Sequence, residues 1–321
     1  MLVPVLLFIV GLVLLIKGGD WFVDGATGIA HRFHVPELLI GATVVSIGTT
    51  LPEVMVSASA AVGGHGEIAY GNAIGSVICN TALIAALTIA VHPSTVDKAA
   101  LRTPVAFFFA AALLYAGVAY FGSFTRTVGL VLLGIFLVYM VVVIRQAKGQ
   151  PELPEETEQP QEPENSMGKD LLLLVLGAAL IAVGANLLVD NGTLIAQALG
   201  VPESVIALTF VALGTSLPEL VTAVTSLIKG HGALSLGNVV GANLFNLVLV
   251  SGLSVSLSPF EVPASKLIGG MNASLVVDIP VMLFVMAFLT LPALKRGKLS
   301  RFQGVTLLCI YAAFCIFQFV A

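Results

Sequence analysis

The sequence places a glutamate in the middle of an apolar run that is long enough to cross a membrane, and it does so twice. The first run extends from Leu38 to Val62 around Glu53, and the second extends from Val205 to Ile228 around Glu219. A helix needs about 20 predominantly apolar residues to span a bilayer, so both carboxylates are expected near the middle of the hydrocarbon. A charge at that depth is costly and usually marks an ion or proton pathway. The pair of glutamates therefore predicts an ion site.

The composition excludes an ordinary soluble domain. Of the 321 residues, 58% are hydrophobic and only 10% are charged, and the mean hydropathy is +1.04. The apolar runs are continuous rather than alternating, which favours helices over a β-barrel. We expect an all-α integral membrane protein with ten transmembrane helices. Their approximate cores are residues 2–16 (continuing to about 30), 38–62, 68–91, 105–121, 128–144, 171–188 (continuing to about 199), 205–228, 234–257, 275–294 and 305–320.

The two halves of the chain are copies of each other. Glu219 follows Glu53 by 166 positions, and 18 of 46 positions are identical when residues 35–80 are compared with residues 201–246. Each half has five predicted helices, so the second copy starts on the opposite side of the membrane. That arrangement is an inverted-topology repeat, which is typical of secondary transporters.

The repeat divides the chain into three parts. Residues 1–147 form the first five-helix repeat, residues 148–167 form a linker, and residues 168–321 form the second repeat. Six glutamates and four prolines fall within residues 151–165, a composition that stays disordered. We interpret this segment as a cytoplasmic hinge between the halves.

The basic residues give the orientation. Eleven of the fourteen Lys and Arg residues lie on one side of the ten-helix arrangement, and only Arg126 and Lys266 lie on the other. Because basic residues concentrate on the cytoplasmic side, this count places both termini outside the cytoplasm. We expect a multi-pass protein of the cell inner (plasma) membrane, with the lipid bilayer as its surroundings.

The second helix carries oxygen ligands around its glutamate. Pro52 removes a backbone donor and frees a carbonyl at Gly48, so the helix is expected to kink or break. Freed carbonyls near Ser46 to Thr50, the hydroxyls of Thr49 and Thr50 and the Glu53 carboxylate then lie within one or two turns. Hard cations such as Ca²⁺ prefer such oxygens. The seventh helix repeats the pattern, which makes a simple packing kink a poor explanation.

The third and eighth helices add amides. The third carries a Gly-Asn-x-x-Gly stretch from Gly71 to Gly75 followed by Asn80, and the eighth repeats it from Gly237 to Gly241 with Asn246. The glycines predict close approach to a neighbouring helix, and asparagines at mid-membrane need partners. We therefore expect broken helices 2, 3, 7 and 8 to surround a central ion site.

Other polar features have ordinary explanations. Asp20 and Asp24 follow Lys17 at the cytoplasmic end of the first helix, where anchoring is favoured over an ion-entrance role. His65 and His231 lie in Gly-His-Gly turns, and a satisfied turn residue is favoured over a pH sensor. The cysteines are expected to be packing residues, because their odd number argues against a disulfide framework. They are Cys79, Cys309 and Cys315.

With both repeats in view, the chain resembles the cation/Ca²⁺ exchanger superfamily, specifically its prokaryotic Na⁺/Ca²⁺ exchanger type. The motifs that carry the resemblance are G-T-[ST]-L-P-E and G-N-x-x-G-[SA]-x-x-x-N, each present twice. The resemblance implies that Glu53 and Glu219 hold Ca²⁺, with oxygens from Thr49 and Thr215. It also implies neighbouring Na⁺ sites completed by Ser46, Thr50, Ser76, Asn80, Ala212, Ser216 and Asn246.

Three positions depart from the family pattern. Asn246 stands where such exchangers often have aspartate, Ala242 replaces a usual serine, and Val77 replaces a usual asparagine. The first two remove charge or oxygen from the site, so the coupling ion and the stoichiometry stay open.

These observations favour a secondary active antiporter, in which Na⁺ entry drives Ca²⁺ extrusion by alternating access at one central site. The alternative in the same class is an antiporter that is coupled to H⁺ or carries another cation. An intramembrane acid/base enzyme lacks a nucleophile or metal-binding histidine at this depth, so we expect no enzyme activity, and a passive channel is the third option. We expect no cofactor beyond the transported ions, no nucleic-acid partner and a monomer.

Overall fold

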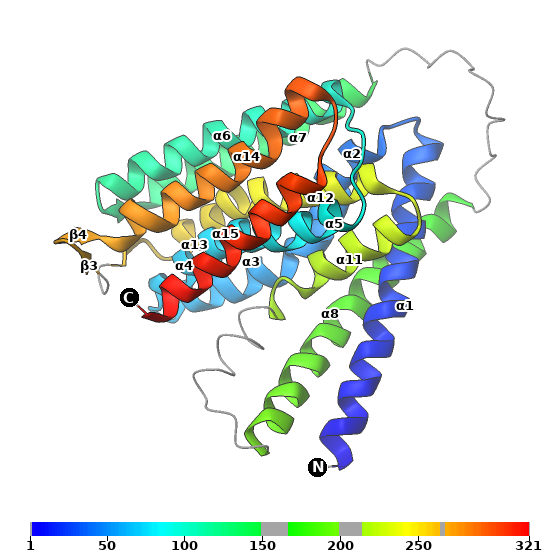
Figure 1. The fold of residues 1–321 in the computed structure, drawn as a ribbon, viewed down its shortest axis with the longest axis horizontal. Coiled ribbons are helices and arrows are strands. Elements are labelled where there is room, and N and C mark those ends of the chain that lie inside the picture. The colour runs from blue at the N-terminus through cyan, green and yellow to red at the C-terminus, as the bar shows by residue number, and fades with distance from the viewer. Residues whose placement is uncertain (1, 149–165, 199–213, 264–266, 321) are drawn as a thin grey trace.

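The computed structural model describes residues 2–148, 166–198, 214–263 and 267–320, and these residues are nearly all helical (Figure 1). Within them, nine helices are long and apolar enough to span a membrane, and α11 (Leu217–Ile228) is a shorter apolar helix. The all-α membrane fold predicted from the sequence is therefore confirmed. The acidic linker and the first part of the seventh expected helix, with Ala212, lie outside the described residues.

The helices follow the expected order. The first half comprises α1 (Leu2–Arg32), α2 (Glu37–Ile40), η1 (Gly41–Val45), α3 (Ser46–Val62), α4 (Gly66–Cys79), η2 (Asn80–Ala85), α5 (Ala86–Val91), α6 (Lys98–Tyr120) and α7 (Arg126–Lys148). The second half comprises α8 (Met167–Ala198), α11, α12 (Gly232–Phe245), η4 (Asn246–Val250), α13 (Ser251–Leu257), η5 (Ser274–Asp278), α14 (Ile279–Arg296) and α15 (Arg301–Val320).

The interruptions in the second, third and eighth transmembrane helices are π-helical segments. The second helix runs through η1, and α3 then continues through Pro52. Side chains bind the carbonyls of η1: Ser46 Oγ donates to the Gly41 oxygen at 2.7 Å, and Tyr139 Oη, from α7, donates to the Ala42 oxygen at 2.8 Å. Single π turns inside α-helices often occur at functional sites. The irregularity of this helix thus lies before Pro52 rather than at it.

The 166-residue offset is visible in local structure. The helices α4 and α12 begin and end at equivalent positions, and the π-helical segments η2 and η4 both start at an asparagine, Asn80 and Asn246. The preceding turns match as well, because Gly64 and Gly230 both have positive φ angles, of 83° and 87°. A left-handed conformation of this kind favours glycine. The repeat found in the sequence therefore builds the same elements twice.

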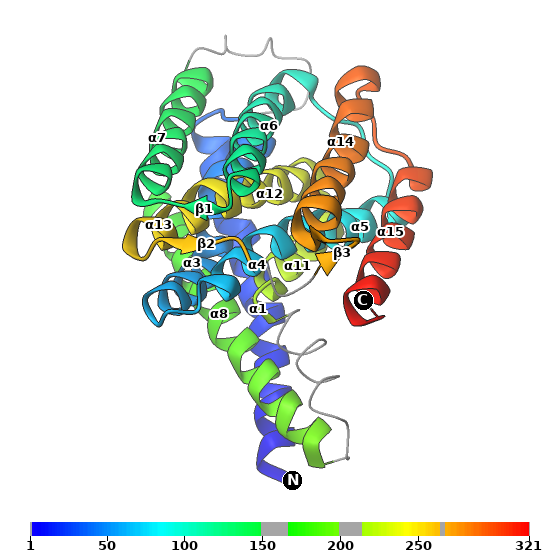
Figure 2. The same cartoon turned by 90° about the vertical axis from the view of Figure 1, so that its left-hand side faces the viewer.

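The helices α1 and α8 form an antiparallel pair that extends away from the other helices (Figures 1 and 2). Glycines allow the backbones to touch, since a Cβ atom at Gly11 would meet the backbone of Gly184 and one at Gly18 would meet the backbone of Gly177. Gly177 is the repeat equivalent of Gly11, and Gly184 is that of Gly18. Such reciprocal contacts are those of a two-fold axis across the pair. The inversion of the whole repeat relative to a membrane stays a prediction.

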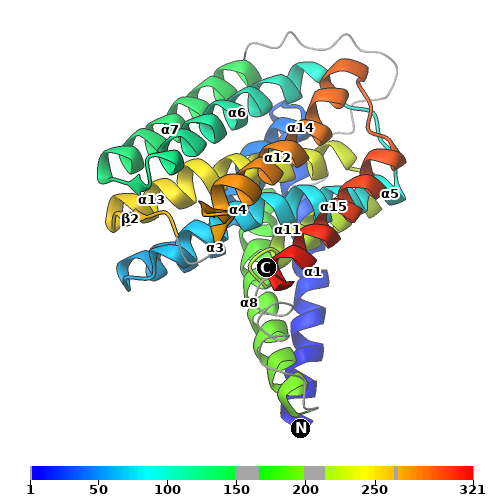
Figure 3. The same ribbon diagram turned by 60° about the vertical axis from the view of Figure 1, so that its left-hand side comes forward.

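The remaining helices enclose the core. Figure 3 shows α6 and α7 lying along α12 and α13, with α14 and α15 on the other side. Two short antiparallel strand pairs join loops, β1 (Ser123–Phe124) with β2 (Phe260–Glu261) and β3 (Leu267–Ile268) with β4 (Met271–Asn272). Almost all residues of η2, α12 and η4 are buried, which places Asn80 and Asn246 inside the bundle.

Candidate ion-binding site

The two glutamates predicted from the sequence meet in the centre of the protein. Glu53 on α3 and Glu219 in the first turn of α11 are both completely buried. The two carboxyl groups lie close enough to interact electrostatically. No carboxylate oxygen of either residue accepts a hydrogen bond within the described residues. Each half of the chain thus contributes one unpaired carboxylate to a common site.

Threonines of the first half approach the carboxylate of the second half. The side chains of Thr49 and Thr50 are neighbours of the Glu219 carboxylate, although neither forms a well-aligned hydrogen bond to it. Thr49 Oγ1 instead donates to Asn238 Oδ1 at 3.1 Å, and Thr50 Oγ1 has no partner within the described residues. The Thr50 oxygen is therefore available to a ligand.

Asparagines at the starts of the π-helical segments complete the centre. Asn80 and Asn246 are both fully buried. Within the part of the chain that the structure describes, neither polar atom of the Asn80 amide has a partner. Asn246 Nδ2 donates to the Ala242 carbonyl at 3.0 Å, which leaves Asn246 Oδ1 unpaired. Both amides therefore present a free carbonyl oxygen.

These unpaired atoms have a common chemistry. Leaving a buried amide or hydroxyl unpaired costs about 1–3 kcal/mol, and an unpaired buried charge costs more. Oxygens of two carboxylates, a hydroxyl and two amides are a suitable ligand set for a hard cation, which would offset these costs together. Among the described residues there is no cluster of three or more His, Cys, Asp and Glu side chains of the kind that holds a tightly bound metal. The arrangement suits a cation that is bound by neutral oxygens around two carboxyl groups.

The other predicted site residues take different positions. Ser46 is buried, and its hydroxyl lies 2.7 Å from the Gly41 carbonyl oxygen and 3.0 Å from the Asn238 carbonyl oxygen, which share its one proton. Ser76 is buried one turn from Asn80 and donates weakly to Asn72 at 3.5 Å. Ser216 is buried at the N-cap of α11, beside Cys79, and Thr215 is half-buried. Ala212 cannot be placed, because it lies outside the described ranges.

Two asparagines near the site, Asn72 and Asn238, were absent from the predicted ligand set. Asn238 joins the halves, because its side-chain and backbone oxygens bind Thr49 and Ser46. Asn72 Nδ2 donates to Ser57 Oγ at 2.8 Å and so joins α4 to α3. The signal was available, since both asparagines belong to the repeated Gly-Asn motif, but the sequence does not say which helix each one faces.

The two Gly-x-x-x-Gly motifs differ in their surroundings. A Cβ atom at Gly237 would overlap the Leu38 carbonyl, and one at Gly241 would overlap Ser46 Oγ and the Ala42 backbone. At Gly71 and Gly75 a Cβ atom would meet no described atom within 4 Å. Among the described residues, the close helix approach predicted for both motifs is therefore seen for the second one, where α12 crosses α2 and η1. The repeat equivalents of the residues that Gly237 and Gly241 meet fall within residues 199–213, outside the described ranges.

The turn before α12 binds the neighbouring helices. Lys229 Nζ lies 2.6 Å from Asp24 Oδ1 of α1, and His231 Nδ1 lies 2.8 Å from Glu37 Oε1 of α2. The expected pair of Lys17 and Asp20 also forms, at 3.9 Å and exposed. The location of these charged residues at one end of the bundle agrees with an anchoring role.

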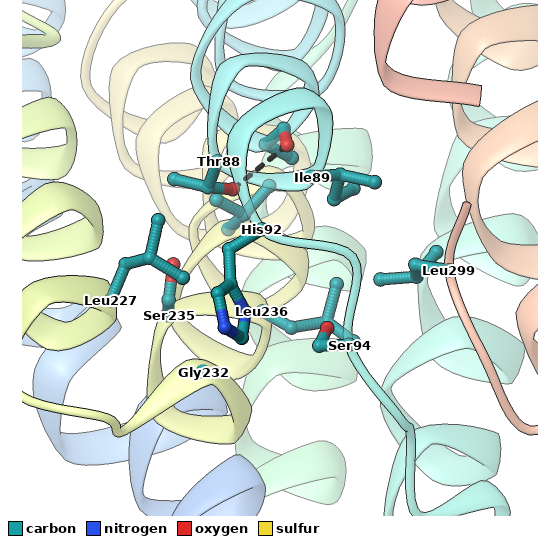
Figure 4. Close-up of a pocket in the computed structure, with 11 residues that line it drawn as sticks. Thr88, Ile89, His92, Ser94, Leu227, Gly232, Ser235, Leu236 and Leu299 are labelled. Carbon is teal, nitrogen blue, oxygen red and sulfur yellow. Dashed lines mark hydrogen bonds between the residues drawn. The ribbon is translucent and has the colours of Figure 1, made fainter. Parts of the chain in front are cut away.

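A small cavity lies at the ends of three site helices (Figure 4). Thr88 and Ile89 of α5, His92 after it, Leu227 of α11 and Ser235 of α12 line its wall, and the His92 ring lies between Ser235 and Ser94. Leu227 is eight residues from Glu219, a distance of about 12 Å along a helix. The cavity does not reach the carboxylates, which are sealed from solvent.

The chain is similar to several known proteins. The family model described as "Sodium/calcium exchanger protein" matches residues 3–145 and 169–320. The chain is 39% identical to the inner membrane protein YrbG of Escherichia coli over 267 residues, which are 82% of each chain. It is 30% identical to the sodium/calcium exchanger MaX1 of Methanosarcina acetivorans over 98% of each chain. A solved structure of the sodium-calcium exchanger NCX_Mj superimposes with a TM-score of 0.81 at 33% identity and covers 97% of each chain.

Proposed function

The chain belongs to the sodium/calcium exchanger family, whose members are transporters rather than enzymes, and on that premise we propose that it exchanges Na⁺ for Ca²⁺ at the site between Glu53 and Glu219. Family membership supports cation antiport in general. The residues and the mechanism are the finer part of the proposal. The observation that carries it is the pair of fully buried carboxylates with no hydrogen-bond partner among the described residues.

Charge balance explains why one site can couple two ions. Two carboxylates carry a charge of about −2, which one Ca²⁺ neutralises. Unit charges 4 Å apart interact by about 4 kcal/mol even at an effective dielectric constant near 20, so the unloaded pair is strained by mutual repulsion. Either Ca²⁺ or Na⁺ relieves the repulsion, and both use the same oxygens. Competition for shared ligands then links the two fluxes without a covalent step.

The neutral oxygens adapt the site to dehydrated cations. A cation that enters loses its water and needs replacement oxygens, which the Thr50 hydroxyl and the amides of Asn80 and Asn246 offer. Thr49 of the first half donates a hydrogen bond to Asn238 of the second half, so a direct contact links the two halves beside the site. Alternating access requires that this sealed site open to one face at a time. We propose that extrusion of Ca²⁺ from the cytoplasm across the inner (plasma) membrane is the physiological direction, driven by Na⁺ entry, with the protein acting as a monomer.

A second candidate is an exchanger coupled to H⁺. Only two carboxylates converge at the site among the described residues, and Asn246 and Ala242 add neither charge nor a hydroxyl. Several Na⁺ ions together would exceed the charge of the site. Protonation of one carboxylate would relieve the repulsion of an otherwise empty site, which favours partial proton coupling.

The test is ⁴⁵Ca²⁺ uptake into proteoliposomes preloaded with Na⁺, with K⁺ or with a proton gradient. Uptake driven by internal Na⁺ alone supports the main proposal, and uptake driven by the proton gradient supports the second. Glu53→Gln and Glu219→Gln keep the side-chain shape and remove one charge each, so each is expected to abolish exchange. Glu261→Gln is the matched control, because Glu261 is exposed on β2. Substantial exchange by both Glu53→Gln and Glu219→Gln would refute the proposed central site. Flux that needs no counter-ion would indicate a channel.

A further inference from the structure

Three fully buried side chains form a hydrogen-bonded group that joins three helices next to the candidate ion site. Asn243 Nδ2 of α12 donates to Thr81 Oγ1 of η2 at 2.7 Å. Met286 Sδ of α14 lies 3.1 Å from Asn243 Nδ2 and 3.2 Å from Thr81 Oγ1. All three residues have no exposed surface. We call Thr81, Asn243 and Met286 the polar clasp.

The clasp lies beside both amides of the site. Thr81 directly follows Asn80 in η2, and Asn243 precedes Asn246 by three residues, less than one helical turn. A contact between Thr81 and Asn243 therefore fixes the backbone that carries Asn80 against the backbone that carries Asn246. Neither of these amides uses its carbonyl oxygen within the described residues, so their separation is not set by a direct hydrogen bond.

Repeat symmetry shows that packing alone does not require this polar contact. The repeat equivalents of Thr81 and Asn243 are Leu247 and Val77, and both are fully buried and apolar. A buried amide is costly unless it is hydrogen-bonded, so an apolar pair is the less expensive solution at such positions. The polar pair nevertheless occurs in one of the two equivalent places, where it joins η2 to the last turn of α12, directly before η4. If the contact served packing alone, there would be no reason for a polar pair in one place and an apolar pair in the equivalent place.

We propose that Thr81 and Asn243 are positioning residues of the cation site, which hold Asn80 and Asn246 at the separation that a bound cation needs. The inference rests on the proposed function, because it assigns these two amides to ion binding. When the clasp is removed, the amide oxygens are no longer pre-positioned and ordering them costs part of the binding free energy. The carboxylates and the route of the ion are unaffected, so the apparent affinity falls while the maximal rate is retained.

The decisive variant is Thr81→Val, which is nearly isosteric and removes only the hydroxyl. Thr290→Val is its matched control, since Thr290 is also fully buried but its hydroxyl donates to the Met286 carbonyl within its own helix, α14. Asn243→Val copies the residue at the equivalent position of the first half, and Thr81→Ser restores the hydroxyl. The measurements are ⁴⁵Ca²⁺ binding to the purified protein and ⁴⁵Ca²⁺ uptake by Na⁺-loaded proteoliposomes over a range of Ca²⁺ concentrations.

We expect Thr81→Val and Asn243→Val each to raise the half-saturating Ca²⁺ concentration about tenfold, equivalent to about 1.4 kcal/mol. Thr81→Ser and Thr290→Val should resemble the wild type. The double variant Thr81→Val/Asn243→Val should be no weaker than either single variant, because both remove the same contact. Equal behaviour of Thr81→Val and Thr290→Val, or a loss of maximal rate at unchanged affinity, would overturn the proposal.

The failure of this inference can be told apart from the failure of the proposed function. If the wild type binds ⁴⁵Ca²⁺, Glu53→Gln abolishes binding and Thr81→Val changes nothing, only the clasp is refuted. If the wild type binds no ⁴⁵Ca²⁺, both proposals fail. Should Thr81→Val not yield a folded protein, Met286→Leu decides, because it conserves volume and removes only the sulfur acceptor. A loss of Ca²⁺ affinity in Met286→Leu, smaller than the tenfold loss expected for Thr81→Val, supports the clasp. If the single variants Met286→Leu and Asn243→Val both keep the affinity of the wild type, the clasp is refuted.

Discussion

Glu37, at the start of α2, accepts a hydrogen bond from His231, which lies 194 positions later in the turn between α11 and α12. The distance from Glu37 Oε1 to His231 Nδ1 is 2.8 Å, and His31 of α1 lies 3.7 Å from the same oxygen. Asp24 and Lys229 are the other charged groups that act on His231. One carboxylate thus joins α2 to α1 and to the turn before α12, at the end of the bundle that the basic residues assign to the cytoplasm.

This contact predicts a pH-dependent stability. The hydrogen bond that His231 donates to Glu37 raises the pKa of His231 above its usual value, and partial burial opposes the increase. A group whose pKa is raised by folding stabilises the folded state below its unfolded pKa of about 6.5, and the contribution is lost as the pH rises through the folded pKa. His231→Gln should therefore lower the melting temperature in detergent more at acidic pH than at alkaline pH. His65→Gln, in the equivalent and exposed turn, is the control, and an equal effect of His231→Gln at both pH values would contradict the prediction.

The two glycine motifs predict unequal tolerance of a methyl group. Gly237→Ala places a Cβ atom against the Leu38 carbonyl, which cannot rotate away, whereas Gly71→Ala at the equivalent position meets open space among the described atoms. Overpacking costs about 1–3 kcal/mol, so Gly237→Ala should lower thermal stability and separate α12 from α2. Gly71→Ala should be neutral or slightly stabilising. The measurement is thermal unfolding of the two purified variants in the same detergent, and similar stabilities would show that the crossing of α12 over α2 is looser than described.

The amide of Asn246 predicts a shallow Na⁺ dependence. Asn246→Asp adds a third carboxylate to a site that has two. Its negative charge can balance one more Na⁺, and unit charges a few ångströms apart attract each other by about 4 kcal/mol. We expect the variant, alone or with Ala242→Ser, to steepen the Na⁺ dependence of Ca²⁺ flux in proteoliposomes. Ala242→Ser alone is the control for the added oxygen without added charge. A wild type with steep, pH-independent Na⁺ dependence that Asn246→Asp leaves unchanged would show that the amide is already an adequate ligand.

The distribution of basic residues predicts the topology. In a background without Cys79, Cys309 and Cys315, Glu156→Cys should resist a membrane-impermeant thiol reagent in intact cells and react after permeabilisation. A cysteine added after Ala321 should react in intact cells. The reason is the excess of Lys and Arg on the side that holds the linker. The reverse labelling pattern would invert the orientation and with it the proposed direction of transport.

The sequence by itself determined the membrane class, the helix order and the two central carboxylates. These are local properties, because the length of an apolar run and the cost of a charge within it are set by a short stretch of chain. The repeat added a second argument. Each half carries one buried carboxylate and one mid-membrane asparagine, and the two copies were expected to face each other across the centre of the protein. Glu53, Glu219, Asn80 and Asn246 were predicted in this way, and all four are fully buried.

Only the tertiary structure decided how equivalent residues are used. The Gly-Asn motif does not say which backbone its glycines meet, and the structure places the Leu38 carbonyl against Gly237. Asn72 binds Ser57 of its own half, whereas its equivalent Asn238 binds Thr49 of the other half. Thr81 meets Asn243, while their equivalents pack as apolar residues. The physical reason is that a hydrogen bond or a close approach depends on which helix lies opposite, and two copies of one sequence pattern acquire different neighbours once they fold against each other.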